Sequence, residues 1–154
     1  MKLLAGIIMA GLIALSLNVA CAADAPTEKL TVISAKDGSK HDFDVEIADT
    51  PTDREIGLMY RTKMDPDHGM LFEMEQNEVV QFWMKNTLIP LDIVFVASDG
   101  TIKSIHDNAI PQDLTGISST VPVTGVIELN GGRAKALGLA AGDKVVHPYF
   151  HNAK

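Results

Sequence analysis

The stretch LTVISAKDGSKHDFDVEIA, residues 30–48, is typical of two antiparallel β-strands joined by a tight turn. An Asp-Gly dipeptide at 37–38 lies between two segments rich in β-formers, and Asp-Gly is favoured in short hairpin turns. Over 41–48, hydrophobic residues alternate with polar and mostly acidic ones, which predicts one buried and one solvated face. We therefore expect a β-hairpin near the start of the folded domain.

The chain beyond this hairpin continues in short segments of the same kind. Thr50 followed by Pro51 predicts a helix N-cap and first turn, with a short helix running through Tyr60. Residues 133–137, followed by Gly138, predict a second short helix. Further strands are predicted over 79–85, 91–97, 101–107, 121–129 and 144–149, and loops over 64–77 and 108–120.

About seven short strands and two small helices predict a mainly β protein. A chain of 154 residues is expected to form a single domain, and strands of this length pack as a sandwich or barrel. We expect a compact β-sandwich of jelly-roll-like type over residues 30–154, preceded by a flexible leader at 23–29.

The amino terminus has the layout of a secretory signal peptide. Lys2 is its only charge, residues 3–17 are apolar, and a small-x-small pattern ends at Ala22. Cleavage after Ala22 predicts a periplasmic or secreted protein. The alternative is a lipoprotein acylated at Cys21, although Asn18 stands where a lipobox usually has Leu.

Charge and cysteine content exclude several classes of function. Without residues 1–22 the chain has 12 basic and 20 acidic residues, a net charge of −8, which argues against nucleic acid as a partner. Cys21 is the single cysteine, so a mature chain starting at Ala23 has no disulfide, thiolate zinc site or cysteine nucleophile. No later segment reaches the ~20 apolar residues that span a bilayer.

The sequence FWMKNT at 82–87 is the most distinctive candidate for a binding site. In a strand, Trp83 and Lys85 share one face, and Asn86 and Thr87 follow at its end. An indole beside polar groups suits a ligand that stacks and hydrogen-bonds. The alternative is structural: Trp83 fills a core layer and Asn86-Thr87 makes a turn.

Three carboxylates form a second candidate set, Asp92, Glu128 and Asp143, of which Asp92 and Glu128 fall within hydrophobic strands. A charge within an apolar strand is costly unless it is paired or exposed. Lys85 or Arg54 could supply the partner in a structural ion pair. Alternatively, Asp92 and Glu128 could act as general acid and base across a cleft, as in glycoside hydrolysis.

Methionines form a third feature, because all five after the signal fall between residues 59 and 84, with His68 among them. Thioethers and imidazole could bind copper in an oxidising compartment. The alternative is that flexible methionines pack an irregular segment onto the sheet. The methionines are Met59, Met64, Met70, Met74 and Met84.

Several separate blocks together resemble the bacterial and archaeal DUF 192 family, a domain of unknown function. The blocks are Gly57-Leu58-Met59, Gly69-Met70-Leu71-Phe72, 82–87, 90–95, Glu128-Leu129 with Gly131, and Gly142-Asp143. The resemblance spans about residues 30–146 and implies a compact jelly-roll-like β-sandwich, often exported. It implies no reaction.

Our leading hypothesis is a noncatalytic periplasmic binding or accessory module, because no complete catalytic constellation is visible. Its ligand, a small molecule, glycan or envelope protein, would meet Trp83, Lys85, Asn86 and Thr87, with Asp92 and Glu128 orienting that surface. The alternatives are an envelope-polymer hydrolase that uses Asp92 and Glu128, and a copper-binding protein. We expect no cofactor and no metal ligands for the leading hypothesis.

Overall fold

The computed structural model describes residues 26–153, which form nine strands, two α-helices and one 3-10 turn. The predicted signal peptide and Cys21 lie outside the described residues. The strands are β1 (Thr27–Ile33), β2 (Lys40–Ala48), β3 (His68–Glu78), β4 (Gln81–Phe82), β5 (Leu91–Val96), β6 (Ile102–Ala109), β7 (Ile117–Ser118), β8 (Val123–Asn130) and β9 (Lys144–Val146); the helices are α1 (Pro51–Ile56) and α2 (Arg133–Leu137), and the 3-10 turn is Pro148–Phe150.

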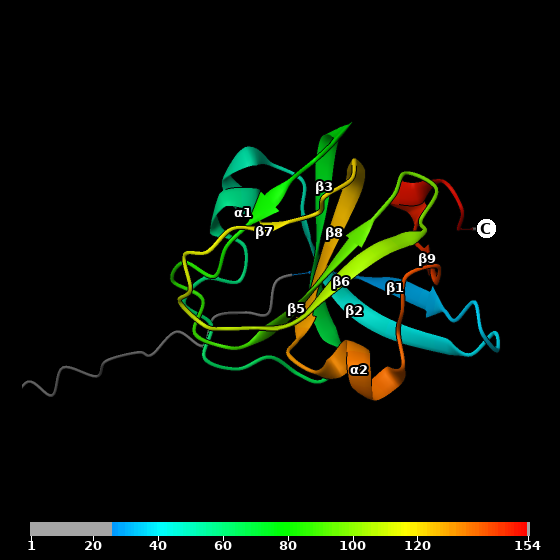
Figure 1. The fold of residues 1–154 in the computed structure, drawn as a ribbon, viewed down its shortest axis with the longest axis horizontal. Coiled ribbons are helices and arrows are strands. Elements are labelled where there is room, and N and C mark those ends of the chain that lie inside the picture. Colours follow the sequence, from blue (N-terminus) through cyan, green and yellow to red (C-terminus); the bar gives the residue numbers. More distant parts are fainter. Residues whose placement is uncertain (1–25, 154) are drawn as a thin grey trace, which may run out of the picture.

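Seven strands form one mixed sheet in the order β6-β5-β8-β3-β2-β1-β9, and β4 and β7 pair separately. Neighbours in the large sheet run antiparallel except β2 and β3, which are parallel and are connected through α1. The large sheet is strongly curled (Figure 1). The predicted mainly β fold with two short helices is confirmed. The expected two-sheet sandwich is corrected, because seven of the nine strands make one curled sheet rather than two packed sheets.

Each face of the curled sheet carries its own hydrophobic core. The first core, on the face covered by α2, includes Leu71, Val94 and Ile127. The second, on the face nearer α1 and β4, includes Phe72, Ile93 and Phe95. Alternation along the strands therefore sends successive residues into two different cores.

The opening hairpin follows the prediction closely. β1 pairs antiparallel with β2 from Thr27↔Glu46 to Ile33↔Lys40. β1 begins at Thr27, so residues 27–29, which we expected in the leader, pair with β2. α1 starts with the predicted Thr50 N-cap, whose side chain accepts a hydrogen bond from the Asp53 backbone N–H. It ends earlier than expected, at Ile56, because the chain turns at Gly57 with φ 48°.

The main error of the sequence prediction is β3, because we expected residues 64–77 to form a loop. β3 lies in the middle of the sheet, between β2 and β8. Met70, Leu71 and Phe72 are all buried, because the two sides of this strand face two cores. A strand buried on both faces lacks the alternation on which the prediction relied.

The predicted strand over 79–85 is also shorter than expected. Only Gln81 and Phe82 pair, with Ser118 and Ile117 of β7. The expected division of its side chains still holds: Val80, Phe82 and Met84 pack on the second core, and Trp83 is exposed. β7 itself lies within the segment 108–120 that we expected to be a loop.

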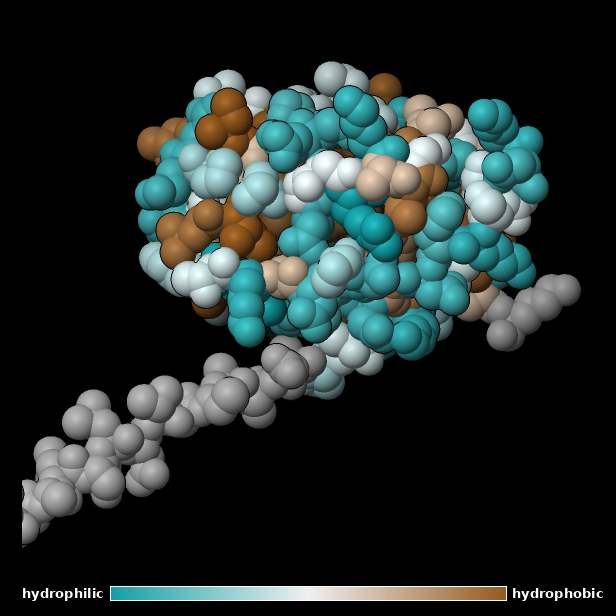
Figure 2. All heavy atoms as spheres, turned by 90° about the horizontal axis from the view of Figure 1, so that it is seen from below, coloured by the Kyte–Doolittle hydropathy of each residue, from teal (hydrophilic) through white to brown (hydrophobic). Residues whose placement is uncertain are grey.

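The surface is largely polar, with small groups of apolar side chains that gather at the end of the molecule carrying α1 and β7 (Figures 1 and 2). Among the exposed large hydrophobic residues are Tyr60, Trp83, Ile110 and Leu114. Within residues 26–153 no helix is long and apolar enough to cross a membrane.

Candidate functional site

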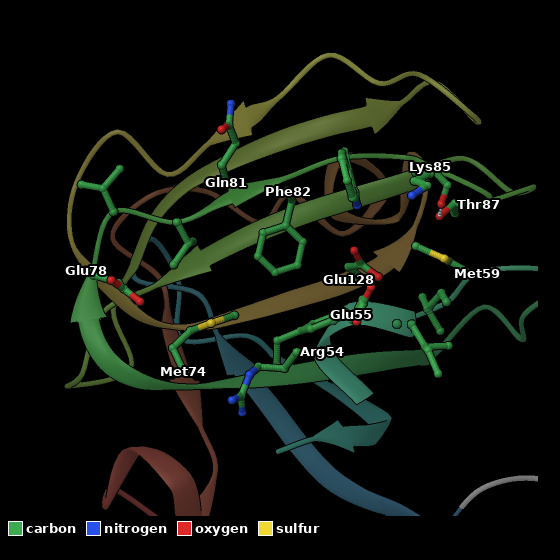
Figure 3. Close-up of a pocket in the computed structure, with 17 residues that line it drawn as sticks. Arg54, Glu55, Met59, Met74, Glu78, Gln81, Phe82, Lys85, Thr87 and Glu128 are labelled. Atoms are coloured by element: carbon green, nitrogen blue, oxygen red, sulfur yellow. Dashed lines mark hydrogen bonds between the residues drawn. The ribbon is translucent and has the colours of Figure 1, made fainter. Parts of the chain in front are cut away.

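A pocket of about 490 Å³ opens between α1 and the segment that follows β3. Figure 3 shows Phe82, Met59 and Met74 around it, with Glu128 on strand β8 behind them. The pocket is lined by residues 54–59, Phe72, Met74, residues 78–83, Lys85, Thr87 and Glu128. Nine of these side chains are apolar and seven are polar or charged, so the lining can contact an apolar group and orient a polar one.

Glu128 provides the buried acid of this pocket. It lies on the central strand β8, paired with Met70 of β3 and Ile93 of β5, and is only 5% exposed. Among the described residues no donor or cation contacts its carboxyl oxygens. Burial raises the pKa of Glu128 to about 8. A buried carboxyl group without a partner is unusual in a folded protein and points to a functional role.

Aromatic rings form one wall of the pocket. Phe82 meets Phe72 edge-on, with ring centroids 5.0 Å apart, and Phe95 in a similar way at 6.3 Å. Trp83 is 50% exposed, and the Lys85 Nζ lies 5.0 Å from the centre of its ring. This wall therefore has a packed inner ring and an exposed outer ring with a cation on it.

Arg54 lines the pocket without directing its charge into it. Its guanidinium donates to the backbone oxygens of Asp49 at 2.6 Å and Glu73 at 3.0 Å, and to the Glu75 carboxylate at 2.7 Å. In Figure 3 its nitrogens point away from Phe82. Arg54 thus holds α1 against β3 and is not the ion-pair partner of Glu128 that we considered.

Asp92 is fully buried but serves the fold. Its carboxylate accepts hydrogen bonds from the backbone N–H groups of Asn108 at 2.7 Å, Gly132 at 2.8 Å and Ala134 at 2.7 Å. These bonds hold the first turn of α2 and the end of β6 to β5. Asp92 faces the first core, whereas Glu128, opposite Ile93, faces the second.

The structure therefore does not bring Asp92 and Glu128 together. Their carboxyl groups lie on opposite sides of the sheet, so they cannot flank one glycosidic bond as the hydrolase hypothesis requires. Asp143, the third carboxylate of the predicted set, accepts from the backbone N–H groups of Ala35 and Ala140, both at 2.8 Å. It joins two loops and is also structural.

Of the predicted ligand-binding residues, Trp83, Lys85, Thr87 and Glu128 do line one pocket. Asn86 lies beside it in the left-handed region, at φ 55°. Its amide donates to the Tyr60 hydroxyl at 2.9 Å, and its backbone oxygen accepts from the Tyr60 N–H at 2.8 Å. Asn86 and Thr87 thus form the turn of the structural alternative, and this turn holds one side of the pocket in place.

The methionines are distributed over the second core rather than gathered around a common centre. Met70 and Met84 are buried there, Met64 and Met74 pack against it, and Met59 lines the pocket. The His68 Nε2 lies 2.9 Å from the Glu46 Oε1. In the described part of the chain, no three His, Cys, Asp or Glu residues group as metal ligands would.

Sequence reasoning missed a second buried acid on the same face. Glu46 of β2 is paired across β3 from Glu128, with Met70 between them. Burial alone would raise the pKa of Glu46, but hydrogen bonds from Arg61, both at 2.5 Å, and from His68 lower it below its usual range. The alternation in β2 suggested that Glu46 was solvated, and only the packing of the 57–67 segment over it buries this side chain.

The sequence prediction also did not identify α1 and Met74 as walls of the pocket, although Gly57-Leu58-Met59 is one of the blocks quoted above.

The DUF192 family model, described as Uncharacterized ACR, COG1430, matches residues 32–147. The chain belongs to the DUF192 family.

Two solved structures are similar to this DUF192 protein. One, from Sinorhizobium meliloti 1021 and described provisionally as a transcription regulator, is 49% identical, with a TM-score of 0.78 over 80% of this chain and 95% of its own. The other, a protein of unknown function from Novosphingobium aromaticivorans DSM 12444, is 35% identical, with a TM-score of 0.77 over 92% of this chain and 100% of its own. No significant match was found among curated proteins.

Proposed function

We propose that this DUF192 protein is a noncatalytic binding module whose pocket takes a small amphipathic molecule. The observation that carries the proposal is Glu128: the residue is 5% exposed, it lines the pocket beside Phe72 and Phe82, and no group among the described residues hydrogen-bonds to its carboxyl oxygens. The Glu128 oxygens are not among the fully buried side-chain atoms of the described residues, so they remain accessible from the pocket. A ligand there can therefore supply the hydrogen bonds that no protein group makes to Glu128.

The apolar side chains of the lining favour an apolar group on the part of the ligand that does not contact Glu128. Phe82, Met59 and Met74 offer an aromatic ring and two flexible thioethers, which adapt to an alkyl or aryl group. The pocket volume, about 490 Å³, is within the range of small-molecule sites. Lys85, whose Nζ lies over the Trp83 ring, and Thr87 also line the pocket.

The arrangement of carboxyl groups favours binding over catalysis. Asp92 is committed to three backbone donors on the opposite face of the sheet, and Glu46 is held by Arg61 and His68. Neither of these acids can therefore share general acid–base work with Glu128, and the other two carboxyl groups that line the pocket, Glu55 and Glu78, are exposed.

The relative from Sinorhizobium meliloti is described provisionally as a transcription regulator, but we do not propose DNA binding for this chain. The chain has a net charge of −7, and phosphate recognition depends on clustered Lys and Arg.

We also propose export behind the signal at residues 1–22, with release after Ala22. Mass spectrometry of the protein secreted from its host tests this, because a lipid on Cys21 would add the mass of its acyl chains.

The binding proposal is tested by screening a library of small apolar amines, alcohols, amides and acids. Trp83 is the sole tryptophan and lines the pocket, so its fluorescence reports binding directly. Hits are expected to shift the NMR signals of Met59, Met74 and Phe82 and to weaken in Glu128→Ala. Asp107→Asn, an exposed acid outside the pocket, is the control. The proposal fails if no compound binds, or if every hit shifts only residues elsewhere.

A further inference from the structure

The charged side chains around the pocket indicate which class of small amphipathic molecule it binds. Glu55 on α1 and Glu78 at the end of β3 line the pocket together with Glu128. Of the two cations in the lining, Arg54 is paired with Glu75 at 2.7 Å, and Lys85 lies over the Trp83 ring. The lining therefore has three carboxyl groups against one cation without a carboxylate partner among the described residues.

The position of Glu128 limits the size of the chemical group that can reach its carboxyl oxygens. The residue is 5% exposed and lies on a strand inside the sheet, and a Cβ on Gly57 would lie 4.0 Å from the Glu128 Oε2. A compact head group fits this recess better than a branched one. A primary ammonium is small and has three donors for the acceptor oxygens of a carboxylate.

We propose that the ligand of this pocket is a primary amine with an alkyl or aryl body, and that its ammonium group pairs with the Glu128 carboxylate. This inference rests on the proposed function and names its ligand class. The net charge of −7 attracts cationic molecules at long range.

Glu128 can gain or lose a proton, whereas an amide side chain at this position could not. In the empty pocket burial raises the pKa of Glu128 to about 8, so the group is mostly protonated at pH 7. Pairing with an ammonium requires the carboxylate, and the proton passes to the solvent. Other titratable groups facing the pocket are Glu55, Glu78, Lys85 and Arg54, and Glu46 lies across β3.

This mechanism predicts a proton-linked affinity. From pH 6 to pH 8 the ionised fraction of Glu128 rises from about one-hundredth to about one-half, so amine affinity is expected to rise about 50-fold. A neutral ligand that accepts a hydrogen bond from the protonated acid would show the opposite trend, losing affinity above pH 8.

The experiment compares three probes with the same body: 4-phenylbutylamine, 4-phenylbutanol and 4-phenylbutyrate. Calorimetry and Trp83 fluorescence give their affinities at pH 6, 7 and 8, in buffers with different ionisation enthalpies. The amine is expected to bind at least 10-fold more tightly than the other two at pH 8 and to release close to one proton at pH 7. Glu128→Gln is expected to abolish the preference and the proton release, whereas Asp107→Asn keeps both.

Two results overturn the inference. If the alcohol or the carboxylate binds the pocket as tightly as the amine, the ligand is not an amine, although the binding module proposed above stands. If the amine preference survives in Glu128→Gln, the ammonium pairs elsewhere. If none of the three probes binds, the amine inference also fails, and the wider library separately decides whether the pocket binds anything.

Discussion

Glu128 and Asp92 lie on neighbouring strands, yet their carboxyl groups face opposite sides of the sheet. In the register between β5 and β8, Glu128 is opposite Ile93, while Asp92 is opposite Leu129. A shift of one residue reverses the face, so the two acids enter different environments. Asp92 accepts three hydrogen bonds from backbone N–H groups, whereas Glu128 faces the pocket and accepts none from the described residues.

Asp92 is expected to be a major determinant of stability. Asp92→Asn keeps the size of the side chain but replaces one acceptor oxygen by a donor that faces backbone N–H groups. We expect a loss of about 3 kcal/mol in the free energy of unfolding, and more for Asp92→Ala. Denaturant unfolding measures it, with Asp107→Asn as the control expected within about 0.5 kcal/mol of wild type. A change that small for Asp92→Asn would refute the structural role.

Glu128 is expected to make stability depend on pH in a defined window. In the unfolded chain its pKa is near the ordinary 4.5, whereas in the folded protein it is about 8. Between these values the unfolded state binds fewer protons, so the free energy of unfolding falls as pH rises from 4.5 to 8 and then levels off. The total effect is on the order of 5 kcal/mol.

Glu128→Gln removes this ionisation. We therefore expect the variant to gain stability over wild type as pH rises from 5 to 8, with the two proteins close to each other at pH 4.5. Urea unfolding at pH 4.5, 6 and 8 measures the difference. A difference that does not change with pH would mean that Glu128 is already ionised in the folded protein.

Gly57 is expected to tolerate no side chain, for two reasons. Its φ of 48° lies in the left-handed region, and a Cβ there would approach the Phe72 ring at 3.1 Å. Gly57→Ala should lose about 2 kcal/mol and weaken ligand binding, because the residue lines the pocket. Gly132→Ala is the comparison: at φ 83° and ψ −3° its backbone is in the αL region that Ala can adopt, and the space around its Cβ is open, so it should cost about 1 kcal/mol. Gly57 has ψ −132°, outside that region, so a cost for Gly57→Ala no larger than for Gly132→Ala would contradict both the backbone strain and the contact with Phe72.

The Arg61 pair with Glu46 is expected to stabilise the segment that covers β2. Arg61→Met leaves Glu46, which is 5% exposed, with only His68 as a partner, at a cost of about 2 kcal/mol at neutral pH. Because the folded pKa of Glu46 is lowered, this contribution is present above the unfolded value and fades as acid protonates the group. The double variant Glu46→Gln/Arg61→Met should cost less than Arg61→Met alone. Additive losses in such a double-mutant cycle would contradict direct coupling.

Much of the fold could be predicted because its signals are local. Asp37-Gly38, the Thr50 cap and the run 133–138 each specify a turn or helix through a few neighbouring residues, and all three appear as expected. β3 could not be predicted by the same means, because burial on both faces removes its alternation. β4 was predicted too long, since its pairing depends on β7, more than 30 residues away.

The candidate site shows the same division. The sequence indicated Trp83, Lys85, Thr87 and Glu128, because an indole beside a lysine and an acid within an apolar strand are visible in one dimension. It also placed Asp92 with them, since both acids have the same local pattern. Strand register separates them, and register is a property of pairs of strands.

The sequence by itself determined a mainly β, acidic chain with a hairpin, two short capped helices and a small set of unusual polar residues. These features depend on residues close together along the chain. Only the tertiary structure decided that one curled sheet carries two cores, that Asp92 holds α2, and that Glu128 is left without a partner among the described residues beneath α1 and Phe82. Those outcomes depend on which distant segments pair and which side of the sheet each one covers.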